Sequence, residues 1–282
     1  MMMIYTQQKK LNTVISDFKK AGKSIGFVPT MGALHNGHLS LMKKALEEND
    51  VVVVSIFVNP TQFNNPKDLE KYPRTLEADV EKIATISKDI LVYSPEISDI
   101  YGTNVSSDFF DFHGLDRVME GAFRPGHFDG VGTVVKKLFE IVTPTKAYFG
   151  QKDYQQLLIV KKMVEITQLP VEIIGCPIVR NADGLALSSR NQLLSEYMQR
   201  KATFIYKILQ EVKELFITKN IIEINEYVTK AFTDDKDFEL EYFTIAEADT
   251  LQTATAKEIG KRYRAFIAVY AEGVRLIDNM EL

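Results

Sequence analysis

Two of the four histidines in this 282-residue chain, His35 and His38, stand three residues apart in the stretch Pro29-Thr-Met-Gly-Ala-Leu-His-Asn-Gly-His38. An apolar run at 25–28 precedes this stretch and an amphipathic run begins at Leu39, so a strand is expected to pass into a helix here. A helix N-terminus offers unpaired N–H groups and partial positive charge to an anion. The stretch therefore predicts a site for the phosphates of a nucleotide.

Other interpretations of the two histidines remain open. They could be ordinary surface or capping residues. They could also bind zinc, but a catalytic zinc needs a third protein ligand, and the sequence has neither a cysteine partner nor a His-Glu-x-x-His helix. The G-x-x-x-x-G-K-[ST] and G-x-G-x-x-G motifs are absent, which argues against a P-loop NTPase and a dinucleotide dehydrogenase.

Two further stretches carry groups suited to phosphate. Lys152 offers a point charge, and Asp153 beside it could cap a helix or hold a magnesium ion through water. Ser188, Ser189 and Arg190 combine two hydroxyls with a guanidinium, which suits a triphosphate. Each stretch alone is ordinary loop chemistry, but three such loops at expected strand ends favour a nucleotide site.

Two glutamines, Gln62 and Gln156, are expected in loops at different strand ends. A neutral amide there suits a small hydroxy acid or a carboxylate, although many such glutamines are only exposed. Another stretch, Arg124-Pro-Gly-His-Phe-Asp-Gly130, could be no more than a structured turn.

The order of the expected elements predicts two domains. Through residue 184, helical runs alternate with strand runs at 25–28, 51–58, 90–93, 147–149 and 171–179. This alternation predicts a Rossmann-like, doubly wound α/β domain with a parallel sheet. Residues 94–129 are expected to be irregular with short elements. Residues 185–282, with helices at 197–216 and 222–232 followed by strands at 240–246, 265–271 and 274–277, predict a smaller α+β domain.

The composition predicts a cytoplasmic globular protein. A net charge of -4 argues against a dedicated nucleic-acid binder, and no apolar run is long enough to cross a membrane. The single cysteine, Cys176, cannot form an internal disulfide and is expected to be a small core residue.

With these motifs the sequence resembles the pantothenate synthetase family over nearly its whole length. The resemblance rests on five motifs in order: Pro29-Thr-Met-Gly32 leading into His35-Asn-Gly-His38, Val58-Asn-Pro-Thr-Gln-Phe63, Arg124 to Gly130, Phe149-Gly-Gln-Lys-Asp-Tyr-Gln-Gln156, and Asp183-Gly-Leu-Ala-Leu-Ser-Ser-Arg-Asn191. It implies that pantoate attacks the α-phosphate of ATP to give pantoyl adenylate and pyrophosphate, and that β-alanine then displaces AMP.

The resemblance also assigns residues. It makes His38 the proton donor and places His35 beside it on the phosphates, together with the catalytic residues Lys152, Ser188, Ser189 and Arg190. It gives pantoate to Gln62 and Gln156, with Gln62 near the β-alanine path. The implied ATP-binding residues are Met31, Gly32, Ala33, Leu34, His35, Asn36, Gly37, His38, Gly150, Gln151, Lys152, Asp153, Val179, Leu187, Ser188, Ser189 and Arg190. Leu187 stands where the family commonly has methionine, a change of similar volume.

The family further implies magnesium carried mainly by the ATP phosphates, a homodimer formed through the larger domain, and a C-terminal lid. Residues 1–184 would bind nucleotide and pantoate, and residues 185–282 would cover them. Two alternatives are another nucleotidyltransferase of the same superfamily, which would form no amide, and a non-catalytic nucleotide-binding protein.

Overall fold

A computed structural model describes residues 2–282, which form two compact units. The first extends to Gln151 and includes Gln156–Pro177, and the second combines Lys152–Gln155 with Ile178–Leu282. The second unit thus begins before the expected position 185 and takes in four residues of the Phe149–Gln156 motif. The assignment of substrate binding to residues 1–184 and of a lid to 185–282 stays a prediction.

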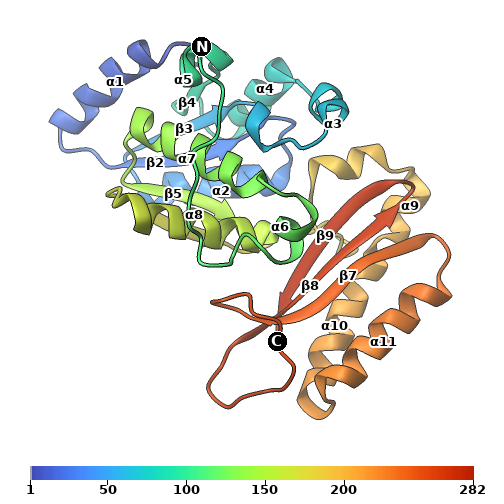
Figure 1. Ribbon diagram of the computed structural model, residues 1–282. Helices are drawn as coiled ribbons and strands as arrows, with labels where there is room; N and C mark the ends of the chain where they lie inside the picture. Colours follow the sequence, from blue (N-terminus) through green and yellow to red (C-terminus); the bar gives the residue numbers. More distant parts are fainter. Residues whose placement is uncertain (1) are drawn as a thin grey trace. The chain divides into compact units, whose positions relative to one another are not determined.

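The first unit contains a parallel sheet with the strand order β1-β4-β3-β2-β5-β6 (Figure 1). The strands are β1 (Ile4–Tyr5), β2 (Ile25–Thr30), β3 (Val51–Ile56), β4 (Leu91–Tyr93), β5 (Lys146–Gly150) and β6 (Glu172–Cys176). The helices along this part of the chain are α1 (Gln8–Lys20), α2 (Asn36–Glu48), η1 (Pro60–Gln62), α3 (Pro66–Lys71), α4 (Leu76–Ile86), α5 (Ile97–Tyr101), α6 (Met119–Phe123), α7 (His127–Val142), η2 (Gln151–Asp153) and α8 (Tyr154–Thr167).

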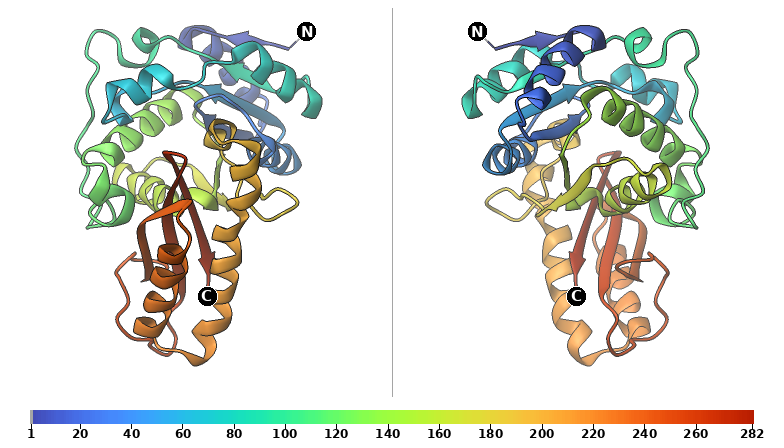
Figure 2. Two further views of the ribbon diagram at one scale, coloured as in Figure 1. Left: turned by 90° about the vertical axis from the view of Figure 1, so that its right-hand side faces the viewer. Right: turned by 90° about the vertical axis from the view of Figure 1, so that its left-hand side faces the viewer.

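Helices cover both faces of this sheet, as the two views in Figure 2 show. Side chains alternate between faces along a strand. On β2, Phe27 packs edge-on against Phe139 of α7 with ring centroids 6.1 Å apart, while Val28 belongs to the core that includes Met42 of α2. Cys176 is buried in that same core. The predicted doubly wound α/β fold is confirmed.

The winding of the sheet reverses at β2, which pairs with β3 on one side and with β5 on the other. Open α/β sheets bind ligands at such a reversal, beside the carboxyl ends of the strands. The stretch that contains His35 follows the end of β2, and Gln151 follows the end of β5. The topology of the first unit therefore places two of the predicted motifs at the edge where a ligand is expected.

The second unit contains an antiparallel sheet in the order β7-β8-β9, which confirms the predicted α+β architecture. Its elements are η3 (Ser189–Leu193), α9 (Glu196–Lys201), α10 (Thr203–Thr218), α11 (Ile221–Asp234), β7 (Phe238–Glu247), β8 (Tyr263–Ala271) and β9 (Val274–Glu281). The apolar sides of α10 and α11 share one core with the sheet, in which Leu209, Val228 and Val269 are fully buried.

Several expected boundaries were wrong, for local reasons. The strand expected at 171–179 ends at Cys176, because Pro177 has no N–H to donate to a ladder. The helix expected at 197–216 is two helices that meet at Ala202. Met198, Ala202 and Ile205 are all buried in the same core, so the apolar spacing continues across the break and does not reveal it.

Two short elements, β1 and α3, were not expected, since two and six residues carry too little periodicity. Residues 94–129 do contain short helices, α5 and α6, within irregular chain.

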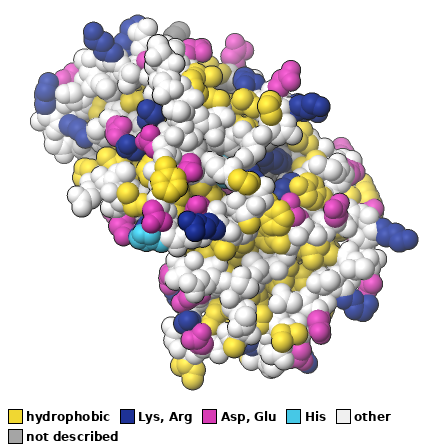
Figure 3. All heavy atoms as spheres, in the orientation of Figure 1, with side chains coloured by type: hydrophobic (Ala, Val, Ile, Leu, Met, Phe, Trp, Pro, Cys, Tyr) yellow, Lys and Arg dark blue, Asp and Glu magenta, His cyan; other side chains and the backbone are white. Residues whose placement is uncertain are grey.

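The face drawn in Figure 3 mixes Lys and Arg side chains with Asp and Glu side chains, and the basic residues do not merge into one area. Among residues 2–282, no helix is both long enough and apolar enough to cross a bilayer.

Candidate active site

His35 and His38 close the N-terminus of α2 as a reciprocal cap. The Gly37 N–H donates to His35 Nδ1 at 3.1 Å, and the His35 N–H donates to His38 Nδ1 at 3.3 Å. The rings lie together, with centroids 4.1 Å apart and planes inclined by 41°. A nitrogen that accepts from an N–H carries no proton, so each neutral imidazole has its proton on Nε2. The cap therefore fixes both rings as Nε2–H donors.

This cap engages backbone N–H groups that were expected to bind the anion. The N–H of Gly37 donates to His35, and the His38 N–H donates to the His35 carbonyl at 2.8 Å. Two N–H groups that were expected to be unpaired are thus paired inside the motif. The imidazoles themselves, with the partial positive charge of the helix end, are the groups that this turn offers to an anion. The capping and the phosphate-binding interpretations of the histidines are therefore compatible.

The loop that leads to His35 is held by a buried carboxylate that no sequence motif indicates. Asp79 of α4 is fully buried and accepts from the Ala33 N–H at 2.9 Å and from the Leu34 N–H at 2.7 Å. The Thr75 hydroxyl donates to the same carboxylate at 3.1 Å. Ala33 has a φ of 50°, a conformation that costs energy for a residue with a Cβ and needs support from its surroundings. Asp79 supplies that support.

Gln62 lies in η1 and is 8% exposed. Its Oε1 accepts from Asn59 Nδ2 at 3.1 Å, and its Nε2 contacts Met31 Sδ at 3.2 Å. Asn59, which is almost fully buried, also accepts from the Tyr101 hydroxyl at 2.6 Å. The structure thus brings together two predicted residues, Met31 and Gln62, in a network that fixes the amide.

The Arg124–Gly130 stretch supports the backbone of Gln62. His127 is buried, and its Nδ1 donates to the Gln62 carbonyl at 2.8 Å, since a carbonyl can only accept. Arg124 Nη1 lies 3.2 Å from His127 Nε2. A Cβ at Gly130 would lie 2.4 Å from the Thr61 carbonyl oxygen, so α7 approaches η1 closely there. This stretch is a positioning element for Gln62 and more than a simple turn.

Gln156 lies in the first turn of α8 and not in a loop, because the chain turns through η2 into α8 immediately after β5. It belongs to the first unit, as Gln62 does, and is partly buried.

Lys152 belongs to the second unit, within η2. Its ammonium lies 3.5 Å from Asp153 Oδ1, and its side chain is only 17% exposed. Its carbonyl accepts from Asn279 Nδ2 at 2.8 Å. The predicted point charge is therefore anchored through its backbone to the strand β9.

The Ser188–Arg190 segment is also in the second unit and begins η3. Ser188 Oγ accepts from the Arg190 N–H at 3.3 Å and caps this short helix. The Leu187 N–H donates to the Val179 carbonyl at 2.9 Å, so these two predicted residues face each other across a narrow hairpin.

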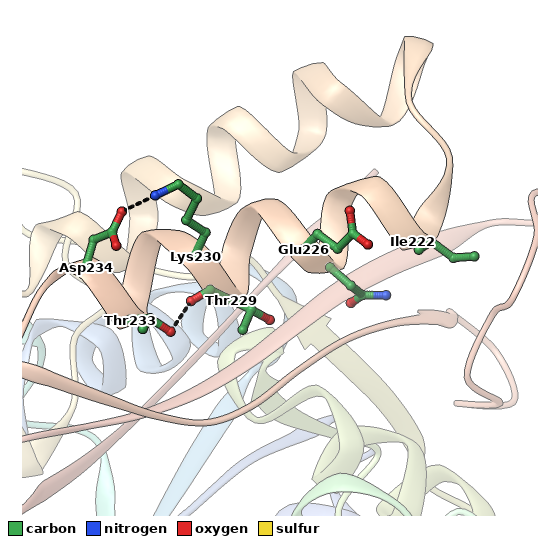
Figure 4. A pocket seen from close by; sticks show the side chains of 7 residues that line it. Ile222, Glu226, Thr229, Lys230, Thr233 and Asp234 are labelled. Atoms are coloured by element: carbon green, nitrogen blue, oxygen red, sulfur yellow. Dashed lines mark hydrogen bonds and ion pairs between the residues drawn. The ribbon is translucent and has the colours of Figure 1, made fainter.

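One surface hollow lies along α11, away from all of these motifs in sequence (Figure 4). Its lining includes Lys230, which pairs with Asp234 at 2.6 Å, and it contains none of the predicted site residues. Among the described residues 2–282, no group of three or more His, Cys, Asp or Glu side chains could hold a metal ion.

The model of the pantoate–β-alanine ligase family matches residues 3–281 of the chain. The chain belongs to this family. It is therefore an ATP-dependent ligase that condenses pantoate with β-alanine, and the resemblance seen in the motifs is confirmed.

Relatives match along their whole length. Pantothenate synthetase of Flavobacterium psychrophilum is 55% identical over 281 residues, with 100% of both chains covered. Pantothenate synthetase of Christiangramia forsetii is 54% identical, with 100% of this chain and 99% of the relative covered. Both alignments thus extend over nearly the full length of the two chains compared.

Solved structures of pantoate–β-alanine ligases share the fold. The pantothenate synthetase of Thermus thermophilus superposes with a TM-score of 0.91 at 39% identity, over 99% of both chains. The Francisella tularensis ligase, solved with a compound described as β-γ ATP and with β-alanine, gives a TM-score of 0.81 at 39% identity, over 100% of this chain and 98% of that one.

Proposed function

We propose that the ligase works through pantoyl adenylate. A pantoate carboxylate oxygen attacks the α-phosphorus of ATP, a P–O bond to the β-phosphate breaks, and pyrophosphate leaves with the electron pair. The β-alanine amine then attacks the acyl carbon, loses a proton, and AMP leaves with the electrons of the C–O bond. Negative charge grows on the leaving pyrophosphate in the first step, so fixed donors at that end would lower the barrier.

The paired imidazoles are the observation that carries this proposal. Both Nδ1 atoms accept backbone N–H groups, so His35 and His38 present Nε2–H donors at the N-terminus of α2 without reorganisation. We assign His38 as the proton donor, with His35 beside it on the phosphates. The adjoining residues Met31, Gly32, Ala33, Leu34, Asn36 and Gly37 would line the ATP.

Asp79 limits which groups of the loop at residues 32–34 can donate hydrogen bonds to the ATP phosphates. The N–H groups of Ala33 and Leu34 are engaged by its carboxylate, and the Gly32 N–H donates to Thr30 Oγ1 at 3.2 Å. Residues 32–34 would therefore shape the ATP site and leave hydrogen bonding to the phosphates to the histidines.

The cationic contacts to the phosphates would come from Lys152 and Arg190, with the hydroxyls of Ser188 and Ser189. The two cations would bind phosphate in different ways: the Lys152 ammonium is a point charge, whereas the planar Arg190 guanidinium can donate to two phosphate oxygens at once. Gly150, Gln151, Asp153, Val179 and Leu187 would complete the ATP-binding set.

Gln62 and Gln156 would hold pantoate, with Gln62 near the path of β-alanine. The network from Tyr101 through Asn59 fixes the Gln62 amide before substrate arrives, and its burial keeps water from competing for the amide.

Magnesium would enter on the ATP phosphates. A Mg²⁺ ion keeps several waters and needs only one or two carboxylates besides substrate phosphates, so Asp153 alone fits such a role. The family resemblance also supports a homodimer formed through the larger domain, which sedimentation analysis would test. The single cysteine, Cys176, suits a cytoplasmic location.

The test compares His38→Ala and Lys152→Ala with His113→Ala and Lys10→Ala, two exposed residues outside the motifs. Loss of a fixed electrostatic donor lowers rates by roughly a hundredfold or more, so pantoate-dependent pyrophosphate release should fall by that factor in the first pair only. Near-normal release from His38→Ala or Lys152→Ala would contradict these roles.

An assay of AMP release in the complete reaction distinguishes the proposed ligase mechanism from the two alternative functions. AMP release should require both pantoate and β-alanine. A nucleotidyltransferase of another specificity would release pyrophosphate without forming the amide, and a non-catalytic nucleotide-binding protein would bind ATP without turnover.

A further inference from the structure

Two neighbouring residues near the end of β9, Asp278 and Asn279, are buried polar side chains that the proposed chemistry does not use. They are 5% and 2% exposed. Successive side chains of a strand point to opposite faces, so the two must serve different neighbours. Within the second unit, those neighbours lead to the two segments proposed to contact phosphate.

Asp278 holds the hairpin that precedes Ser188. Its two oxygens accept from Arg180 Nη1 at 2.5 Å and Arg180 Nη2 at 2.9 Å. The same guanidinium donates to the Gly184 carbonyl at 3.1 Å and stacks 3.9 Å above the ring of Tyr206. Arg180 therefore fixes both sides of the hairpin at once. A bidentate pair of this kind defines orientation as well as distance.

The hairpin transmits this restraint to the phosphate segment. Arg180 forms an antiparallel bridge with Ala186, and the Ala186 carbonyl accepts from Asn191 Nδ2 at 3.0 Å. Ser188 and Arg190 lie between Ala186 and Asn191. The position of their short helix therefore depends on the pairing of Arg180 with Asp278.

Asn279 holds the other segment. Its Nδ2 donates to the Lys152 carbonyl at 2.8 Å, and its Oδ1 accepts from Arg264 Nη1 at 2.6 Å. Arg264 is itself 5% exposed and lies 4.2 Å above the ring of Tyr154, two residues beyond Lys152. The buried Arg264 cation thus sets the orientation of the Asn279 amide. The segment that contains Lys152 is held at two residues, at Lys152 by Asn279 and at Tyr154 by Arg264.

We propose that Asp278 and Asn279 are positioning residues that set the spacing between Lys152 and the Ser188–Arg190 segment for the triphosphate of ATP. One strand connects both segments, so a small displacement of β9 changes both. Misplacement of reacting or binding groups by about 1 Å can lower a rate by roughly a hundredfold. This inference rests on the proposed phosphate roles of Lys152 and of Ser188–Arg190.

The test uses Asp278→Asn and Asn279→Asp, which preserve side-chain volume. The first weakens the bidentate pair, and the second turns an acceptor toward the Lys152 carbonyl while keeping an acceptor for Arg264. The matched control is Glu241→Gln, which weakens another ion pair of β9, since Glu241 of β7 accepts from Arg275 Nε at 2.8 Å and from the Tyr270 hydroxyl at 3.2 Å.

We expect pantoate-dependent exchange of pyrophosphate into ATP to fall by roughly tenfold to a hundredfold in both test variants, through a raised KM for ATP, a lowered kcat or both. Glu241→Gln should stay within about twofold, with a Tm shift comparable to theirs. Equal losses in all three variants, or none in the test variants, would overturn the inference.

A double-mutant cycle with Lys152→Ala separates positioning from general stability. If Asn279 acts through Lys152, Asn279→Asp should change the rate by less than about twofold in the Lys152→Ala background, and additive effects would contradict the inference. If Asn279→Asp does not fold, Asn279→Ala enters the same cycle. Wild-type protein without exchange would refute the proposed phosphate chemistry instead.

Discussion

Replacing Asp79 with Asn should destabilise the first unit and loosen the turn before His35. The carboxylate is fully buried and serves three donors through two oxygens: Leu34 N–H on Oδ1, and Ala33 N–H and the Thr75 hydroxyl on Oδ2. An Asn side chain has nearly the same volume but only one acceptor oxygen. At least one backbone N–H must then face an NH₂ group.

The expected cost follows from these contacts. A hydrogen bond to a charged group contributes about 1.5–3 kcal/mol, and a buried donor left without an acceptor costs about 1–3 kcal/mol. Asp79→Asn should therefore lower the free energy of unfolding by about 2–5 kcal/mol. Ala33 should also lose the support for its positive φ, so the imidazoles of the cap would become less well placed.

Two measurements check this prediction. Urea unfolding gives the stability change, and hydrogen exchange of a peptide that covers residues 30–36 reports the local effect. The matched control is Asp50→Asn, because the exposed Asp50 carboxylate also accepts a backbone N–H and a hydroxyl, both from Ser24, at 2.8 and 2.7 Å. Water can replace those bonds, so the control should change little.

A change of less than about 0.5 kcal/mol in the free energy of unfolding of Asp79→Asn, the range of ordinary surface substitutions, would show that the buried carboxylate does not stabilise the loop. An equal change in Asp50→Asn would contradict the prediction, since burial would then not matter. Unchanged exchange of residues 30–36 would show that Asp79 does not hold the loop.

Two further predictions concern a charged cluster and a close contact. Hydrogen bonds from Lys44 foremost, then from Lys146 and Tyr148, lower the pKa of Glu48 to about 2 from its ordinary 4.5. Because the folded-state pKa of Glu48 is depressed, the stabilisation by its ion pairs is present above about pH 4.5 and is lost as the pH falls toward 2. The Tm of wild type should therefore exceed that of Glu48→Gln by less and less across this window. A Tm difference that stays constant with pH would contradict the prediction. Gly130→Ala would place a Cβ 2.4 Å from the Thr61 carbonyl oxygen and displace η1, so the KM for pantoate should rise by roughly tenfold or more. The control is Gly22→Ala in the turn after α1, where a φ of 70° makes the substitution costly but the added Cβ meets nothing within 4 Å, so stability should fall while the KM for pantoate stays unchanged. An unchanged KM in Gly130→Ala would show that η1 does not position the pantoate site.

The sequence alone was sufficient for the fold class and the family. The alternation of apolar runs indicated the parallel sheet, because a strand covered on both faces is apolar along most of its length, as β3 is with four valines and an isoleucine beside the buried Ser55. The five motifs identified the family because each is a short continuous stretch of residues, and the spacing within such a stretch can be read directly from the sequence. The pair His35 and His38 was found for the same reason.

Tertiary structure decided what holds these motifs in place. Asp79 lies 44 residues beyond His35 by the numbering of the chain, and Asn279 is separated from Lys152 by 127 positions. Neither residue stands in a recognisable pattern, since an isolated Asp or Asn is usually a surface residue. Only the folded chain shows that they are buried, and burial is what turns an ordinary polar side chain into a fixed partner: away from water, its hydrogen bonds must be made to the backbone segments packed against it.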